Sequence, residues 1–433
     1  MEFKIQVARL RHAFALLEPA IPRKATLDTL KCVRLGDGQA VASDLDTTVV
    51  VELPEIREVE GACLLPYKVV RDLLRFTPGS ASMTLVPRDG KVHMYTQGTQ
   101  ASFAAKDPGE YPPPPKIGEA AMGSLVDGDD LVGTLSALVQ YTATEESRPV
   151  LTAVCLTLLE PMEAAAADGF RLAVRTLRSG FHGGEGRRML LHRDTVRLLQ
   201  KLWKLAPPPS DAPEGSPIAE VVVARRPVWM ECDPSQVQFR FGDVTVVSKV
   251  VEGTFPNYRQ LIPTGHTSRV TVFGADLERA VRQVGSVAED GGGIVRLAWE
   301  GERMTVSGKA IEVGDVEVAL KAQAESPGHI AFNMAYLQSY LKGKEGPVAI
   351  SMTEPSAPGV LTYQGVSVVI MPMLVKDDSP KAAEPPPAGD DVSTEAVETP
   401  LEGPDPDEAE QEAVQAVERA KPKRRRRKKQ DPD

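Results

Sequence analysis

The sequence is poor in aromatic residues and has no long apolar run. Aromatic residues make up 5% of its 433 positions, and no stretch approaches the roughly 18 apolar residues that a membrane-spanning helix requires. Its start, MEFKIQVARL, alternates apolar with polar residues and lacks the apolar centre of a signal peptide. We therefore expect a cytoplasmic protein with no membrane partner. An apolar content of 42% still allows two to four ordinary domains.

Cysteine is scarce, and its spacing argues against disulfides and metal sites. The four cysteines lie far apart and form no CxxC pair, which predicts buried, reduced thiols. They are Cys32, Cys63, Cys155 and Cys232. The six histidines have no spacing typical of a metal site. No metal and no cofactor is therefore predicted.

Motifs for catalysis are missing as well. There is no GxxxxGK[ST] phosphate-binding loop and no nucleophile in a recognisable setting. Asp44 and Asp46 in SDLDTTV could form a carboxylate pair, but Asp44 aligns with Asp168 of ADGFRLAV, which favours a turn that the architecture repeats. No catalytic residue is predicted, and we expect the chain not to be an enzyme.

Charge is distributed unevenly over a net of −10. Residues 376–418 carry 2 basic and 14 acidic side chains, whereas RAKPKRRRRKK (419–429) carries 9 basic and no acidic ones. Such a segment has too few large apolar groups to offset the entropy of ordering. Residues 376–433 are therefore predicted to be a disordered tail, acidic first and then basic. The proline-rich stretch 207–217 is predicted to be a surface loop rather than a linker.

One unit of sequence recurs three times. Each copy opens with a short strand and a helix whose apolar residues lie at i, i+4 and i+7, one buried helical stripe. These triplets are Leu10, Phe14 and Leu17; Leu131, Leu135 and Leu138; and Leu277, Val281 and Val284. Asp129 or Asp130, and Asp276, are predicted to cap the second and third of these helices.

A second helix follows in each copy, and a hairpin ends the unit. The predicted apolar triplets are Leu65, Val70 and Leu73; Leu191, Val196 and Leu199; and Phe332, Leu337 and Tyr340. The hairpins are predicted to turn near Gly98, Gly242 and Gly365. This repetition predicts an α+β fold of three homologous domains, at 1–118, 119–264 and 265–375, with PPPPKIG (112–118) and PTGHTS (263–268) as the joints.

Basic residues recur on the outer faces of the second helices. For any single basic residue, exposure to solvent is the usual explanation. Because these basic residues recur on equivalent helices of an acidic protein, contact with phosphate is favoured. Such contact is independent of base sequence and sensitive to salt. The helical candidates are Lys68, Arg71 and Arg75; Arg193, Arg197, Lys201 and Lys204; and, on the first helix of the third copy, Arg279 and Arg282.

Five segments carry a family resemblance in order and spacing: ATLDTL (25–30), ADGFRLAV (167–174), EGTFPNYRQLIP (252–263), FNMAYL (332–337) and VVIMPM (368–373). Together they resemble the bacterial β sliding clamp, the processivity subunit of DNA polymerase III, over residues 1–375. The resemblance implies a head-to-tail homodimer of three-domain subunits. In such a ring, helices line the hole, duplex DNA passes through it, and a clamp loader and the polymerase III catalytic subunit are partners.

The resemblance also implies site residues. Lys24, Arg75, Arg148, Arg193 and Arg197 become candidates for contact with DNA. An apolar pocket between the second and third domains is expected to take short linear motifs of many proteins, for which adaptable methionines are suited. Its matching positions are Leu151, Gly169, Phe170, Arg171, Leu172, Pro256, Leu261, Val369, Ile370, Met371, Pro372 and Met373, with Met334 and Tyr336 nearby.

Some positions depart from the family pattern. Pro149 and Val150 replace aromatic residues seen in some clamps, Gln260 and Leu374 stand where a basic residue is common, and the 376–433 tail is additional. The tail could bind DNA through RRRRKK, screen the pocket, or only increase solubility. The alternative function is a clamp-fold adaptor that binds peptides but does not encircle DNA, and an enzyme with an unfamiliar site is a third.

Overall fold

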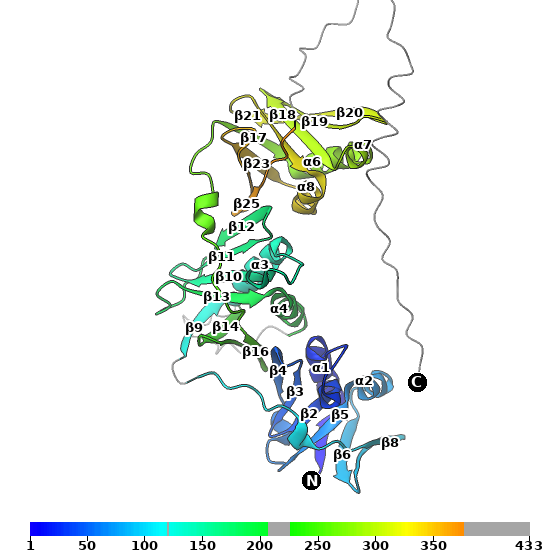
Figure 1. Ribbon diagram of the computed structural model, residues 1–433. Coiled ribbons are helices and arrows are strands. Elements are labelled where there is room, and N and C mark those ends of the chain that lie inside the picture. Colours follow the sequence, from blue (N-terminus) through cyan, green and yellow to red (C-terminus); the bar gives the residue numbers. More distant parts are fainter. Residues whose placement is uncertain (119–120, 207–225, 376–433) are drawn as a thin grey trace, which may run out of the picture. The chain divides into compact units, whose positions relative to one another are not determined.

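The computed structural model describes residues 1–118, 121–206 and 226–375 (Figure 1). The predictions for the 207–217 loop and for the 376–433 tail lie outside these ranges. Within them, four antiparallel sheets and seven α-helices repeat one order of elements three times. The predicted α+β fold of three similar units is thereby confirmed. No helix of the described residues is long and apolar enough to span a membrane.

The first unit starts with a strand and a helix and ends with a three-stranded meander. Its elements are β1 (Phe3–Gln6), α1 (Val7–Leu17), β2 (Cys32–Gly36), β3 (Gln39–Ser43), β4 (Thr47–Glu52), β5 (Ala62–Pro66), α2 (Tyr67–Phe76), β6 (Ser82–Arg88), β7 (Lys91–Thr96) and β8 (Thr99–Ala104). Helices α1 and α2 pack together.

The second unit repeats this order. Its elements are β9 (Met122–Asp127), α3 (Gly128–Leu138), β10 (Ala153–Leu158), β11 (Glu163–Ala167), β12 (Arg171–Thr176), β13 (Arg187–His192), α4 (Arg193–Leu205), β14 (Pro227–Cys232), β15 (Gln236–Phe241) and β16 (Val244–Lys249). Helices α3 and α4 pack together.

The third unit adds a short helix and a short strand to the same plan. Its elements are β17 (Ser268–Phe273), α6 (Gly274–Gln283), α7 (Gly285–Asp290), β18 (Ile294–Glu300), β19 (Arg303–Ala310), β20 (Gly314–Lys321), β21 (Gln323–Ala324), β22 (Gly328–Asn333), α8 (Met334–Leu341), β23 (Pro347–Met352), β24 (Gly359–Tyr363) and β25 (Val366–Ile370). Here α6 packs on α8. The boundaries between the units, near 118 and 264, stay predictions.

Strand pairing joins consecutive units into continuous sheets. β4 of the first unit pairs with β16, the last strand of the second, in an eight-stranded sheet ordered β5-β2-β3-β4-β16-β15-β14-β9. β12 pairs in the same way with β25, the last strand of the third unit, in a nine-stranded sheet ordered β13-β10-β11-β12-β25-β24-β23-β17-β21. The two remaining sheets, β1-β6-β7-β8 and β20-β19-β18-β22, have four strands each.

The predicted helix stripes form the core, with small corrections. All nine apolar residues predicted for the first helices are buried. In α2, Val70 is buried as predicted, but Leu74 is buried and Leu73 only half-buried, so this one position was predicted one residue early. Leu65, Leu191 and Phe332 are buried in the strands before the second helices rather than in the helices themselves. All four cysteines are free and buried, as predicted.

The predicted helix caps are wrong. Helix α3 starts at Gly128, and its cap is Asp127, whose side chain accepts a hydrogen bond from the Asp130 N–H at 3.1 Å. Helix α6 starts at Gly274, so Asp276 lies in its first turn and Phe273 holds the cap position. An acidic residue in the first turn still interacts favourably with the helix dipole.

The predicted turns are confirmed. Gly98, Gly242 and Gly365 have φ values of 82°, 58° and 78°, a region that glycine enters without steric cost. Asp44 and Asp168 make the same local turn, because the Oδ1 of each accepts hydrogen bonds from the backbone N–H groups two and three residues later. Asp44 and Asp46 therefore belong to a turn that the fold repeats.

Close packing at the start of α3 gives a first testable prediction. A Cβ added to Gly128 would lie 2.2 Å from the Trp203 ring and 2.5 Å from the Arg226 carbonyl oxygen. We expect Gly128→Ala to lower the free energy of unfolding by about 2 kcal/mol, since a backbone atom cannot give way freely. Gly133 on the same helix has no atom within 4 Å of such a Cβ, so Gly133→Ala should be neutral or stabilising. Urea denaturation of both variants measures the difference, and equal midpoints would contradict the prediction.

Candidate partner-binding and nucleic-acid-binding surfaces

The Met-Pro-Met segment after β25 is held by backbone hydrogen bonds on two sides. The Met371 N–H donates to the Phe170 carbonyl at 2.9 Å, at the turn before β12. The Met373 N–H donates to the Ala331 carbonyl at 2.8 Å, in β22 of the third unit. The segment therefore lies where the second and third units meet, the place that the sequence predicts for the peptide pocket.

Large apolar side chains are exposed around this segment. Phe170 is 58% exposed, Met371 46% and Leu374 79%; Leu261, another predicted pocket residue, ends the 3-10 helix Tyr258–Leu261 and is 55% exposed. The ring of Phe170 stacks on that of Tyr336 from α8, with the ring centroids 5.8 Å apart. Grouped apolar exposure of this kind marks interaction sites on soluble proteins.

Other predicted pocket residues lie beneath this surface or at its edge. Leu151, Leu172 and Val369 are buried in one cluster with Phe255 and Tyr258, and Ile370 is fully buried in the main core. These four support the surface from below. The half-buried members are Arg171, Met334, Tyr336, Pro372 and Met373, and the exposed ones include Gly169 and Pro256.

Arg171 connects the two units at this surface. Its guanidinium forms an ion pair with Asp168 at 2.8 Å, and its side chain is only 10% exposed. It also donates to the Ser339 hydroxyl of α8 at 3.2 Å and to the Gln140 carbonyl at 3.2 Å. The aromatic rings of Tyr141 and Tyr336 lie against it, with centroids 5.2 and 4.7 Å from the guanidinium carbon. We conclude that Arg171 holds the surface in shape.

Glu163 in β11 holds the segment 255–261, which includes Pro256 and Leu261, in place. The Tyr258 hydroxyl donates to the Glu163 carboxylate, and Arg259 donates to the same oxygen at 3.0 Å. Burial raises the pKa of Tyr258 to about 12, and the neighbouring carboxylate adds to this shift. The FPNYR segment is thereby fixed on the sheet from inside the second unit.

The predicted DNA-binding residues of the first unit differ in how free their charges are. On α2, Lys68 and Arg75 are exposed and make no ion pair within the described residues. Arg71 lies between them and pairs with Glu18 at 3.4 Å and Asp72 at 2.8 Å. Lys24 is exposed in the loop after α1.

In the second unit the same distinction appears. Arg193 is half-buried, and its guanidinium donates to the Ala143 carbonyl at 2.9 Å. Arg197 pairs with Asp194 at 3.4 Å, whereas Lys201 is exposed on α4. Arg148 is exposed just before the 3-10 helix Pro149–Thr152. These cations come from α4 and from one loop beside it.

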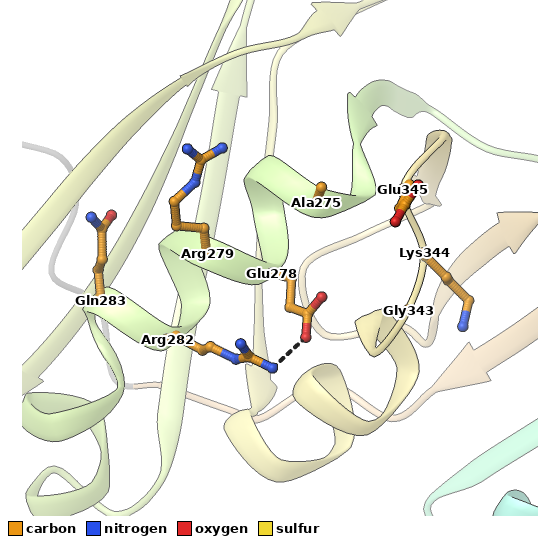
Figure 2. A pocket seen from close by; sticks show the side chains of 8 residues that line it. All are labelled: Ala275, Glu278, Arg279, Arg282, Gln283, Gly343, Lys344 and Glu345. Carbon is orange, nitrogen blue, oxygen red and sulfur yellow. Dashed lines mark hydrogen bonds and ion pairs between the residues drawn. The ribbon is translucent and has the colours of Figure 1, made fainter.

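The third unit has a shallow hollow of about 410 Å³ between α6 and the turn after α8 (Figure 2). Arg282 faces Glu278 across 2.6 Å in this hollow, and Arg279 pairs with Asp276. Lys344 donates to the Tyr340 carbonyl, and burial lowers the pKa of its ammonium. Arg279, Arg282 and Lys344 thus each have an acidic or carbonyl partner, unlike Lys68 and Arg75 of the first unit.

Known proteins with similar sequences support this fold. Residues 259–374 match the family described as DNA polymerase III beta subunit, C-terminal domain. The chain is 25% identical to the beta sliding clamp of Caulobacter vibrioides over 394 residues, which covers 87% of this chain and 100% of that protein. It is also 25% identical to the beta sliding clamp of Synechococcus elongatus, over 85% of this chain and 97% of that protein.

Over most of its length the chain is similar to bacterial β sliding clamps.

Solved sliding clamps share the whole described fold. A DNA polymerase sliding clamp from Pseudomonas aeruginosa superposes with a TM-score of 0.75 at 17% identity, over 87% of this chain and 100% of that chain. The beta subunit from Thermotoga maritima gives 0.74 at 20% identity with the same coverage. One structure of the Pseudomonas aeruginosa clamp is bound to griselimycin.

Within this clamp fold, sequence reasoning missed the residues that hold the surface in place. Asp168 was interpreted only as a turn residue, and Tyr141, Ser339 and Glu163 were not considered for the site. The side chains of Tyr141, Ser339 and Glu163 meet Arg171 or Tyr258 only through tertiary contacts, whereas Asp168 pairs with Arg171 three residues later. A possible signal was the Asp-Gly-Phe-Arg spacing itself, since a buried arginine requires acidic and aromatic partners.

Proposed function

We propose that this chain is a DNA sliding clamp. Two copies form a head-to-tail ring around duplex DNA, and the ring tethers the DNA polymerase III catalytic subunit and other DNA-processing proteins for processive synthesis. A clamp loader opens the ring and places it on DNA. In this proposal the protein catalyses no reaction itself, since its role is to keep enzymes on their template.

The strand pattern is the observation that carries the proposal. At each joint between two units, the third of the three consecutive strands after the unit's first helix pairs with the last strand of the next unit. These pairs are β4 with β16 and β12 with β25. The equivalent strands without such a partner in the described residues are β20 of the third unit and β8 of the first. A second copy can supply both missing pairs, β20 to β8 and β8 to β20. Such a heterologous contact closes after two chains.

Loose contact with DNA supports the same function. The cations lie on helices and loops, and their charges meet phosphates without reading bases. A closed ring holds DNA by topology, so each contact can stay weak and the ring can slide. The apolar surface at Phe170 and Met371 supplies a separate site for partner peptides.

Retention on DNA of different topology tests the proposal. Clamp assembled on nicked circular DNA with a loader should elute with the DNA on gel filtration, and cutting the DNA to a linear form should release it. A stable dimer that is not retained on the circle, yet still binds the polymerase, would contradict the proposal and support the peptide-binding adaptor.

Salt dependence checks the predicted DNA face. We expect the double variant Lys68→Ala, Lys201→Ala to reduce the slope of log affinity against log salt by about 2, because each lost phosphate contact releases about one counterion fewer. Lys91 and Lys116 are exposed lysines outside the helices, so their double alanine variant is a matched control. Fluorescence anisotropy with a labelled duplex across a salt series measures both slopes. If the control loses as much slope as the helix variant, the helices are not the DNA face.

A further inference from the structure

Phe76, the last residue of α2, has no place in the core. It is 82% exposed, and the buried residues of α2 are Tyr67, Val70 and Leu74. Val69, two turns before Phe76, is 48% exposed. Since seven residues make about two turns of an α-helix, Val69 and Phe76 lie on one face. Helix α2 thus has an apolar strip on its surface in addition to its buried one.

Two cations flank this strip, and Asp72, which lies on the same face, is paired with Arg71. The guanidinium carbon of Arg75 lies 5.6 Å from the centre of the Phe76 ring. Lys68 stands next to Val69, and both Lys68 and Arg75 are exposed without an ion pair among the described residues. A free phenyl ring beside unpaired cations is the combination that binds single-stranded nucleic acid, where the cations meet phosphates and the ring stacks on a base.

We propose that Phe76 stacks on an unpaired base where duplex DNA gives way to single strand, so that this clamp distinguishes such a junction from uniform duplex. The proposal rests on the function proposed above, which brings α2 close to DNA. Inside a duplex every base face is covered by its neighbours, and uncovering one requires unstacking. An unpaired base has a free face, and stacking of an aromatic side chain on it is tolerant of sequence. The ring therefore gains from single-stranded DNA what duplex DNA cannot offer.

Two labelled DNA probes test the proposal by fluorescence anisotropy at low salt. One is a blunt duplex, and the other is the same duplex with a single-stranded oligothymidylate overhang. We expect the wild-type protein to bind the overhang probe about fivefold or more tightly than the blunt one. Phe76→Ala should abolish this preference and leave affinity for the blunt duplex unchanged, and Phe76→Trp should retain it. Because Phe76 is exposed, its variants should unfold at the wild-type temperature.

Phe273→Ala is the matched control, since Phe273 is a second exposed phenylalanine, 60% exposed at the end of β17. A preference that survives in Phe76→Ala, or that is lost equally in Phe273→Ala, would overturn the proposal. So would a Phe76→Ala protein that keeps the preference but no longer binds the polymerase, because Phe76 would then contact a protein. Retention of wild-type protein on circular DNA is measured independently, so a failure of the clamp function itself can be told apart.

Discussion

Proline substitution in strand β20 should convert the dimer into monomers that are not retained on circular DNA. Successive backbone N–H groups in a strand point to opposite sides. Of the single variants Val318→Pro and Ala319→Pro, one therefore loses a donor to β19 and the other loses the donor at the free edge. The variant that loses only the donor at the free edge should fold normally, and its edge should no longer pair with β8 of another copy.

Native mass, thermal unfolding and DNA retention together evaluate this pair of variants. We expect the variant that loses the donor to β19 to have a lowered Tm. The variant that loses the donor at the free edge should keep the wild-type Tm, have half the native mass of the wild-type dimer, and not be retained on circular DNA. Each variant is thus the other's control, because the two differ only in which side of β20 is blocked. If both single variants stay dimeric, the subunit contact lies elsewhere and the strand argument is contradicted.

The threefold repeat could be predicted from sequence because its signal is local. Helical spacing in FKIQVARLRHAFALL and the later copies depends only on residues within a few turns, and those stripes are buried as predicted. Glycine turns are equally local. The cap of α3 was harder, since Asp127, Asp129 and Asp130 are all suitable capping residues. The choice of Asp127 depends on where the helix starts, and the first residue of the helix, Gly128, packs closely against Trp203 and Arg226.

The site was predictable in part, where a family motif marks it. Phe170 and Met371 were predicted for one pocket, and the structure brings them within a backbone hydrogen bond of each other. What holds them could not be predicted, because the partners of Arg171 come from distant parts of the chain; Ser339, for example, lies 168 residues later. The ion pairs of Arg71 and Arg282 were also missed, and they distinguish shielded cations from free ones.

Arg171→Ala should weaken both the fold and the binding of partners. Its loss leaves the carboxylate of Asp168, which is 12% exposed, without its cation, and removes the guanidinium against which the rings of Tyr141 and Tyr336 lie. Removing one partner of a buried ion pair typically costs about 3 kcal/mol of stability. Since Ser339 and Tyr336 belong to the third unit, the apolar surface should also lose its shape, and affinity for the polymerase catalytic subunit should fall about tenfold or more.

Asp168→Asn separates the charge from the turn, because an asparagine Oδ1 can still accept from the Phe170 and Arg171 N–H groups. This variant should cost clearly less stability than Arg171→Ala and leave partner binding nearly intact. Arg171 keeps its contact with the Tyr336 ring and its hydrogen bonds to Ser339 and Gln140. Urea denaturation and titration with the polymerase subunit measure the two effects. If Arg171→Ala binds the polymerase as tightly as wild type, then Arg171 is a structural residue of the joint only. Partner binding would then depend on the exposed apolar side chains of the surface, among them Phe170 and Met371.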